Sequence, residues 1–272
     1  MQIAPYVSER HRRRRKVQRY LFATIGVFAL YFIFLGVAWF FMRAPIFRVQ
    51  HVVVTGNATV QSADVTALLQ ADPSGRLGFL GSVFGWGNMF TWPDKVPAQN
   101  LKFIPQLAAV AVSKDYFSHT ITLNVTERVP YGIWCFVPSS DNANEQCYWF
   151  DSNGILFERS LSTQGNLIYM VNDRSQSPRG LNGTVLPAQF NGNFLTVMDV
   201  LRQTGLGIGE IDLKDLSLEE VDVATTEGPR IEFSLRFPAT DYLSVLKNII
   251  GQSGFGKLQY VDCRTEDRVF YK

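Results

Sequence analysis

An uninterrupted apolar stretch near the amino end dominates the pattern of hydrophobic and polar positions. Residues 20–42 carry no charge, and only one threonine and two glycines interrupt the bulky apolar side chains. A helix of that length rises about 34 Å, enough to cross a hydrocarbon core of about 30 Å. A cleaved signal peptide has a shorter apolar core that ends in small residues, whereas this stretch ends in the bulky segment 39–42. We therefore predict one transmembrane helix over residues 20–42.

The charges around this helix predict its orientation. Residues 1–19 contain seven basic side chains and one acidic side chain, a net charge of +6, whereas the rest of the chain carries a net −4. Basic residues concentrate on the cytoplasmic side of membrane helices. We therefore expect residues 1–19 to form a basic cytoplasmic tail and the bulk of the chain to lie outside the cytoplasm. The alternative is a tail that binds nucleic acid, but beside a membrane helix the tail is more typical of a topology signal that contacts anionic lipid, and we predict no nucleic-acid partner.

The next eighty residues predict a compact α+β unit. Alternating apolar positions predict a strand over 47–54, with a one-residue shift of phase that indicates a bulge near Gln50 and His51. Helical periodicity follows from residue 61, with Ser62 as the expected cap, and again over 97–104. Period-two alternation then predicts strands over 107–113 and 120–126. The glycine- and aromatic-rich segment 73–93 matches no phosphate-binding or dinucleotide motif, and we expect a loop that packs its aromatics against the domain or the membrane.

Beyond residue 128 the pattern becomes mostly β. Two hairpins, two helices and two closing strands follow one another, with glycines at the expected turns and helix ends. The expected strands are 131–137, 146–151, 155–157, 221–224, 230–237, 258–264 and 268–271, and the expected helices are 194–205 and 240–251. The predicted fold class is thus α+β: an amino-terminal transmembrane helix, a small α+β domain, and a mostly antiparallel β domain with flanking helices.

Catalytic chemistry has little support in the sequence. The chain has three histidines and no Gly-x-Ser-x-Gly, His-Glu-x-x-His or Cys-x-x-Cys motif. A Cys135–His119 pair is the one nucleophile and base that spacing leaves open. We predict no enzymatic activity, no cofactor and no metal.

Two cysteines flank a polar hairpin loop. Cys135 and Cys147 stand almost symmetrically about residues 138–145, so they can face each other across two strands. In an oxidising compartment they can form a disulfide worth about 3 kcal/mol; the alternative is two partly buried thiols. Cys263 is then left over and is expected to be a small buried hydrophobe.

The carboxyl end predicts an interaction surface. The last strand, 268–271, has almost no chain after it and is expected at a sheet edge. Its free N–H and C=O groups can pair with a strand of another protein, while alternate side chains supply specificity. The alternative is that this strand completes the sheet and its outer edge stays unpaired.

Taken in order, several short motifs resemble the bacterial cell-division family FtsQ/DivIB. The resemblance covers nearly the whole chain, and the order and spacing of the motifs carry it. The motifs are the basic tail, the single apolar helix, Phe47-x-Val-x-x-Val-x-Val-x-Gly56-Asn57, Val125-Thr126-Glu127-Arg128-x-Pro130, Trp134, Phe150-Asp151-x-x-Gly154-x-x-Phe157, Tyr260-Val261-Asp262-x-Arg264 and Asp267-Arg268-Val269-Phe270-Tyr271-Lys272.

The resemblance implies a POTRA domain over 47–128, a β domain over 129–272 and no enzymatic activity. It implies a place at the division septum in the bacterial inner (plasma) membrane, where such proteins join FtsB/DivIC-like and FtsL-like partners and help to control septal peptidoglycan synthesis. A partner would add a strand to the last strand, with Arg264 as an ion-pair donor to a partner carboxylate. The implied partner-binding residues are Tyr260, Arg264, Arg268, Val269, Phe270 and Tyr271. The chain departs from the family at Cys263, where an aliphatic residue is usual, in the 73–93 loop, and in ending at Lys272 without a tail.

Two other functions compete with the division scaffold. One is an extracytoplasmic translocation or chaperone factor that binds unfolded chains by strand addition. The other is a membrane-anchored cell-wall enzyme, which needs a convergent catalytic set that the sequence does not show. We prefer the scaffold.

Overall fold

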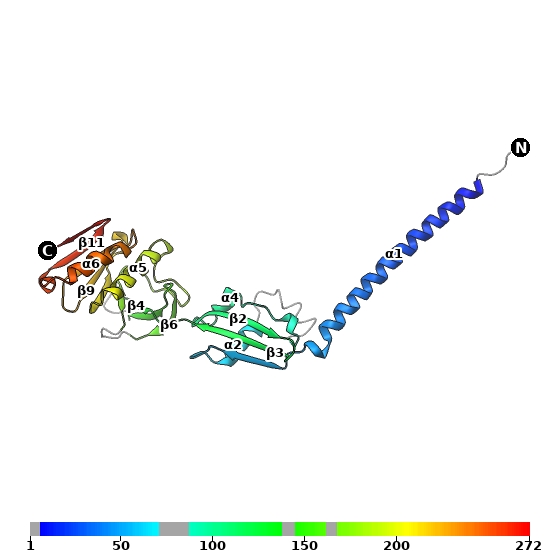
Figure 1. The fold of residues 1–272 in the computed structure, drawn as a ribbon, viewed down its shortest axis with the longest axis horizontal. Coiled ribbons are helices and arrows are strands. Elements are labelled where there is room, and N and C mark those ends of the chain that lie inside the picture. The colour runs from blue at the N-terminus through cyan, green and yellow to red at the C-terminus, as the bar shows by residue number, and fades with distance from the viewer. Residues whose placement is uncertain (1–5, 71–86, 138–144, 162–167) are drawn as a thin grey trace. The chain divides into compact units, whose positions relative to one another are not determined.

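The computed structural model describes residues 6–70, 87–137, 145–161 and 168–272, and it is an α+β protein (Figure 1). The chain divides into two compact units. The first contains Met1–Gly56, Gln61–Val96 and Val110–Val125, and the second contains Asn57–Val60, Pro97–Ala109 and Thr126–Lys272.

One long helix, α1 (Tyr6–Arg43), contains the whole predicted span. Its segment Lys16–Phe40 is long and apolar enough to cross a membrane, by length and composition. The helix begins well before residue 20, so the basic segment is helical rather than a separate tail from residue 6 onward. Residues 6–19 contain neither glycine nor proline, and the arginines and lysine among them favour helix, which accounts for the extension.

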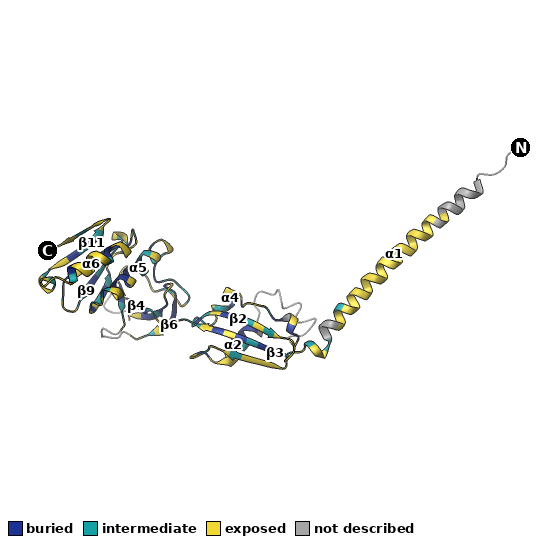
Figure 2. Ribbon diagram, in the orientation of Figure 1, coloured by how far each residue is buried: buried dark blue, intermediate teal, exposed yellow. Residues whose placement is uncertain are grey.

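A three-stranded sheet organises the first unit, with strand order β1–β3–β2 and β1 parallel to β3. The helix α2 carries the predicted apolar stripe, and Val65, Leu68 and Leu69 are all buried. Figure 2 shows that α1 is exposed along most of its described length, whereas buried residues lie in the two units. Ser62 is the first residue of α2 rather than the residue before it. The bounds are β1 (His51–Thr55), α2 (Ser62–Gln70), β2 (Leu107–Asp115) and β3 (Thr120–Glu127).

The predicted strand over 47–54 is wrong in its first half. Phe47 ends the short 3-10 helix η1 (Pro45–Phe47), and its ring packs on Phe90 with centroids 4.7 Å apart. Arg48 forms an isolated bridge with Asn88. The strand therefore begins only at His51, and the change of phase marks the entry into β1 instead of a bulge within a longer strand.

Part of the glycine- and aromatic-rich segment lies outside the described residues, which resume at Gly87. In its described end, η2 (Met89–Thr91) buries Met89, and Trp92 is buried as well. The second predicted helix is shorter than expected: α4 covers only Ala98–Leu101. Pro105 disfavours helical geometry at the residue before it, so the helix pattern over 97–104 does not extend to its end.

A nine-stranded sheet forms the second unit, in the order β12–β11–β10–β9–β8–β7–β4–β5–β6. Five of its eight strand pairings are antiparallel, whereas β4–β7, β7–β8 and β10–β11 are parallel. The strands β7 and β8 have no counterpart among the predicted elements. The bounds are β4 (Gly132–Phe136), β5 (Gln146–Phe150), β6 (Leu156–Ser160), β7 (Met170–Asp173), β8 (Ile208–Leu213), β9 (Glu220–Thr225), β10 (Arg230–Ser234), β11 (Tyr260–Thr265) and β12 (Arg268–Tyr271).

Two helices, α5 (Ala188–Thr204) and α6 (Leu243–Ile250), pack with the sheet residues into one hydrophobic core. The stripe predicted for α5 is buried, and the helix ends at Gly205, whose φ of 71° only glycine adopts without strain. A 3-10 turn, η4 (Thr240–Tyr242), precedes α6. Two more are η3 (Leu216–Leu218), between β8 and β9, and η5 (Phe255–Lys257), between α6 and β11. The strand predicted over 230–237 ends at Ser234.

Glu127, at the end of β3, holds the loop at residues 57–60. Its Oε1 accepts hydrogen bonds from the backbone N–H groups of Ala58, Thr59 and Val60 at 2.8, 3.0 and 2.9 Å, and its Oε2 accepts one from Thr59 Oγ1 at 2.6 Å. Burial opposes ionisation, but the hydrogen bonds from Thr59 and the three amides outweigh it and lower the pKa of Glu127 to about 2.

Arg128 stabilises the turn that follows β5. Its guanidinium donates to Asp151 Oδ2 at 2.5 Å and to the Pro105 carbonyl at 3.1 Å. Asp151 in turn accepts the N–H groups of Asn153 and Ile155, both at 2.9 Å. The motifs around Glu127-Arg128 and Asp151 that support the family resemblance are therefore structural: they shape the start of the second unit.

Candidate partner-binding edge

The strand β12 is the outermost strand at one end of the nine-stranded sheet, as expected from its place at the chain's end. It pairs antiparallel with β11, with Val261 opposite Tyr271 and Asp262 opposite Phe270. Lys272 donates its N–H to the Tyr260 carbonyl at 3.3 Å and accepts the Tyr260 N–H at 3.5 Å. Since backbone groups alternate in direction along a strand, the N–H and C=O of Val269 and Tyr271 point away from β11, toward the open edge.

Apolar side chains line this edge on both faces. Val269 and Tyr271 share the face of buried Val261, and Val269 packs against the core. Phe270 lies on the opposite face, beside Asp262. The side chains of Phe270 and Tyr271 are each 49% exposed. The edge thus offers unpaired backbone groups together with apolar surface above and below them.

The other edge of the sheet, β6, has a different character. Leu156 is already hydrogen-bonded beyond the sheet, because its N–H donates to the Gly183 carbonyl at 2.8 Å and its carbonyl accepts from Asn182 N–H at 2.7 Å. Further along β6, Glu158 and Arg159 are exposed. Charged side chains on an edge strand discourage pairing with another chain. Among the described residues no segment pairs with the outer side of β12, where the exposed rings of Phe270 and Tyr271 lie between Arg268 and Lys272.

A hydrogen bond from the residue before α6 stabilises the β11–β12 hairpin near its turn. Tyr242, the last residue of η4, donates its hydroxyl to the Thr265 carbonyl at 2.9 Å. Its burial raises the pKa of the phenol. The turn itself places Asp267 at a φ of 61°, a left-handed conformation that aspartate tolerates better than most residues. The hairpin is therefore held at its turn as well as by its strand pairing.

Arg264 makes its ion pairs within its own chain. Its guanidinium lies 2.8 Å from Asp262 Oδ2, 2.8 Å from Glu232 Oε2 and 3.0 Å from Glu220 Oε2. The hydrogen bonds that Arg264 donates to the Asp262 carboxylate lower the pKa of Asp262 and raise the pKa of Arg264. Arg264 therefore ties β9, β10 and β11 together. The exposed Arg268 makes no ion pair among the described residues and is the more available cation at the edge.

A lattice of charges covers the sheet face opposite α5 and α6. Four carboxylates occupy facing positions on four successive strands: Asp212 on β8, Asp222 on β9, Glu232 on β10 and Asp262 on β11. Carboxylates that face each other across neighbouring strands repel, so basic side chains must lie between them. Asp222 is paired with Lys214 at 2.6 Å and with Arg230 at 2.8 Å. Arg174 reaches Asp212 at 3.3 Å, although burial and the neighbouring Glu210 still raise the pKa of Asp212.

Sequence reasoning missed this lattice, although a signal for it was present. Charged residues recur at every second position in Glu210-x-Asp212-x-Lys214, Glu220-x-Asp222, Arg230-x-Glu232 and Asp262-x-Arg264. Such alternation is typical of strands with one solvated face. The pattern predicts the face, but the partners across strands follow only from the sheet order.

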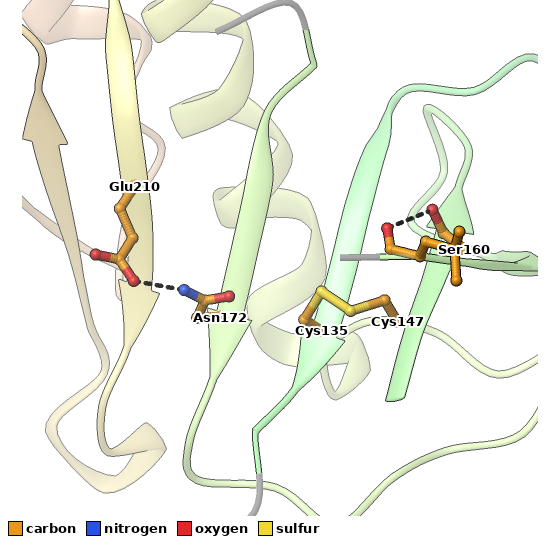
Figure 3. Close-up of a disulfide and its surroundings, with 6 residues drawn as sticks. Cys135, Cys147, Ser160, Asn172 and Glu210 are labelled. Atoms are coloured by element: carbon orange, nitrogen blue, oxygen red, sulfur yellow. Dashed lines mark hydrogen bonds between the residues drawn. A yellow bond between two sulfur atoms is a disulfide. The ribbon is translucent and has the colours of Figure 1, made fainter. Parts of the chain in front are cut away.

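The two cysteines of the hairpin form a disulfide (Figure 3). Cys135 on β4 faces Cys147 on β5 and Asn172 on β7, and the Asn172 amide donates to Glu210 Oε1 on β8 at 2.5 Å. The disulfide leaves no thiol for the Cys135–His119 pair considered above. Glu145 lies near both sulfurs, but sulfurs joined to each other cannot serve as thiolate metal ligands.

The third cysteine is unreactive. Cys263 is fully buried in the core beneath the β11–β12 hairpin. Burial, with a smaller effect of Asp262, raises the pKa of its thiol to about 12. A thiol with that pKa is protonated at neutral pH and is neither a nucleophile nor a metal ligand.

Comparison with known proteins adds no assignment. The chain matches no protein-family model, and no curated protein is significantly similar to it. We therefore infer function from the helix, the two units and the edge strand described above.

Proposed function

We propose that this chain is a membrane-anchored, non-enzymatic scaffold of bacterial cell division, of the FtsQ/DivIB type. In this proposal α1 is the single transmembrane helix, residues 47–128 form a POTRA domain, and residues 129–272 form the partner-binding β domain outside the cytoplasm. Its partners are FtsB/DivIC-like and FtsL-like proteins at the septum, and its output is control of septal peptidoglycan synthesis through their placement.

The observation that carries the proposal is the contrast between the two edges of the nine-stranded sheet. The β12 edge combines outward N–H and C=O groups on Val269 and Tyr271 with exposed apolar rings, whereas β6 is blocked and charged. An extended partner segment therefore fits best as a tenth strand beside β12. Arg268 and Lys272 flank the apolar positions, so a partner strand with acidic residues beside a short apolar segment fits this edge best.

Arg264 forms its ion pairs within its own chain. We therefore assign it a different role from the one that the family resemblance implies. With three carboxylates of its own chain around it, Arg264 positions Asp262, and through the β11 backbone it holds β12 in register. We propose Arg268 as the side chain that meets a partner carboxylate, and Arg264 as the residue that keeps the edge rigid.

The test measures binding of the full chain, in nanodiscs, to the extracytoplasmic part of the FtsB/DivIC homologue from the same host. Tyr271→Pro removes an N–H that points outward and is not used inside the sheet, and proline is tolerated at such edge positions. Tyr271→Ala removes the same ring and keeps the N–H. Strand addition predicts that Tyr271→Pro binds about tenfold more weakly than Tyr271→Ala, because one interstrand hydrogen bond is lost.

Two further variants locate the site. Phe270→Asp is expected to abolish binding, because it places a carboxylate beside Asp262 at the docking position. Leu218→Asp changes an equally exposed apolar residue in η3 and is expected to leave binding unchanged. Equal affinities of the two Tyr271 variants would exclude strand addition. No binding by the folded wild-type chain would overturn the division role, and binding to unfolded polypeptides would then be measured to test the translocation alternative.

A further inference from the structure

A second open edge exists in the first unit. The strand β1 is one edge of the three-stranded sheet, and β2 is the other. The outer side of β2 is already occupied: Val96 N–H donates to the Val110 carbonyl at 3.3 Å, and Val112 N–H donates to the Asp94 carbonyl at 3.1 Å. In the part of the chain that the structure describes, no segment pairs with the outer side of β1.

The strand β1 is rich in valine and contains no lysine, arginine, aspartate or glutamate. Its sequence is His51-Val52-Val53-Val54-Thr55, and Val52 and Val53 are 37% and 44% exposed. An edge strand that must stay unpaired usually carries lysine, proline or a bulge. The strand β1 has none of these, and its three β-branched valines favour further strand pairing.

Hydrogen bonding to β3 shows which backbone groups of β1 remain free. His51 faces Thr120 in the parallel register, and its N–H donates to the His119 carbonyl at 3.3 Å. His51 therefore directs its backbone groups toward β3, and alternation gives Val53 and Thr55 the same direction. The N–H and C=O groups of Val52 and Val54 consequently point outward.

One antiparallel register with a second β1 satisfies all of these groups. With Val53 opposite Val53 of the second copy, Val52 of each copy faces Val54 of the other, and each such pair exchanges two N–H···O=C bonds. A shift of two residues in either direction satisfies only the groups of Val52 or only those of Val54. In the favoured register His51 faces Thr55, so no like charges meet. The five-residue strand is thus complementary to itself.

We propose that β1 pairs with β1 of a second copy of this chain, antiparallel and centred on Val53. The β12 edge is not complementary to itself in this way. Self-pairing centred on Phe270 places Arg268 opposite Lys272 of the other copy, where like charges repel. We therefore expect a second copy of this chain to pair with β1 and a different protein to pair with β12.

The membrane anchor makes so short a pairing effective. Four backbone hydrogen bonds and a few valine contacts form a small interface, well below the area of a stable soluble dimer. The seven residues 44–50 separate the end of α1 from β1 and reach at most about 25 Å. Two copies anchored in one membrane thus present their β1 strands at a high effective concentration.

A cysteine scan of the full chain in lipid vesicles tests the register. Single cysteines replace residues 51 to 55 in turn, and disulfide-linked dimer is measured under mild oxidation. Only residue 53 faces itself, in a non-hydrogen-bonded pair whose Cβ atoms lie within about 5 Å, so Val53→Cys is expected to cross-link at least fivefold more than any neighbour. Background is low, because Cys135 and Cys147 are already bonded and Cys263 is buried.

Mixed copies and a collision control complete the test. Vesicles that hold Val52→Cys and Val54→Cys chains together are expected to cross-link more than either variant alone. Phe117→Cys, at a position that is 98% exposed in the same unit, reports random collision. A peak at residue 53 supports the proposal. Yields that are equal across residues 51 to 55, or no higher than that of Phe117→Cys, would overturn it. Partner binding at β12 is measured separately, so the two proposals fail independently.

Discussion

The end of β3 allows a quantitative prediction, because the Glu127 carboxylate holds the loop at residues 57–60 through hydrogen bonds. The change is Glu127→Gln, which keeps the shape of the side chain and removes the carboxylate that accepts from Ala58, Thr59 and Val60. A pKa lowered from 4.5 to about 2 corresponds to about 3 kcal/mol in favour of the folded state. The side chain is partly exposed, so solvent screening reduces this to about 1.5 kcal/mol.

The pH dependence gives this prediction its distinctive signature. The folded-state pKa of Glu127 lies below its unfolded value, so its stabilisation is fully present above about pH 5 and disappears as the pH falls toward 2. The free-energy difference between wild type and Glu127→Gln is therefore expected to be about 1.5 kcal/mol at pH 7 and to shrink at pH 3. Equilibrium urea unfolding of the full chain in detergent micelles, followed by tryptophan fluorescence, measures both values.

Glu158→Gln is the matched control. Glu158 is exposed on β6 and makes no ion pair within the described residues, so its replacement is expected to change the free energy of unfolding by less than about 0.5 kcal/mol. The reasoning fails if Glu127→Gln behaves like Glu158→Gln at pH 7. It also fails if Glu127→Gln is equally destabilising at pH 7 and pH 3, since the lost interaction would then not depend on the charge.

Two further predictions concern stability. Replacing both Cys135 and Cys147 with serine is expected to lower the free energy of unfolding by about 3 kcal/mol, and a reductant should produce the same loss in wild type and none in the variant. Gly56→Ala is expected to cost more than about 2 kcal/mol, because Gly56 has a φ of 80° and a Cβ there would lie 2.3 Å from the Val125 carbonyl oxygen. Gly180→Ala, with open space around it, serves as the control in thermal unfolding, and an equal loss in both glycine variants would contradict the steric argument.

Several elements were predictable because local pattern decides them. The apolar stretch over 20–42, the α5 stripe ending at Gly205, and the hairpin that joins Cys135 to Cys147 all follow from neighbouring residues in the chain. The position of β12 at a sheet edge was also expected. For the helices and the hairpin the signal is a short-range periodicity, which needs no knowledge of the other elements.

The errors arose where distant contacts override local pattern. The alternation from Phe47 onward suggested an early strand, but Phe47 packs on Phe90 and the strand begins only where His51 meets His119. The strand β7 was missed because its four residues, Met170–Asp173, carry too little pattern, and it becomes a strand by lying between β4 and β8.

The sequence by itself determined the apolar helix, the α+β character, and which faces of most strands are apolar, because these depend on composition and period. Only the tertiary structure decided the strand order, and with it the facing of Asp212, Asp222, Glu232 and Asp262 and the inward pairing of Arg264. It also decided that β12 and β1 are open while β6 and β2 are occupied or charged. The physical reason is that a hydrogen-bonded edge is defined by which strand lies beside it, and that neighbour is distant in the chain.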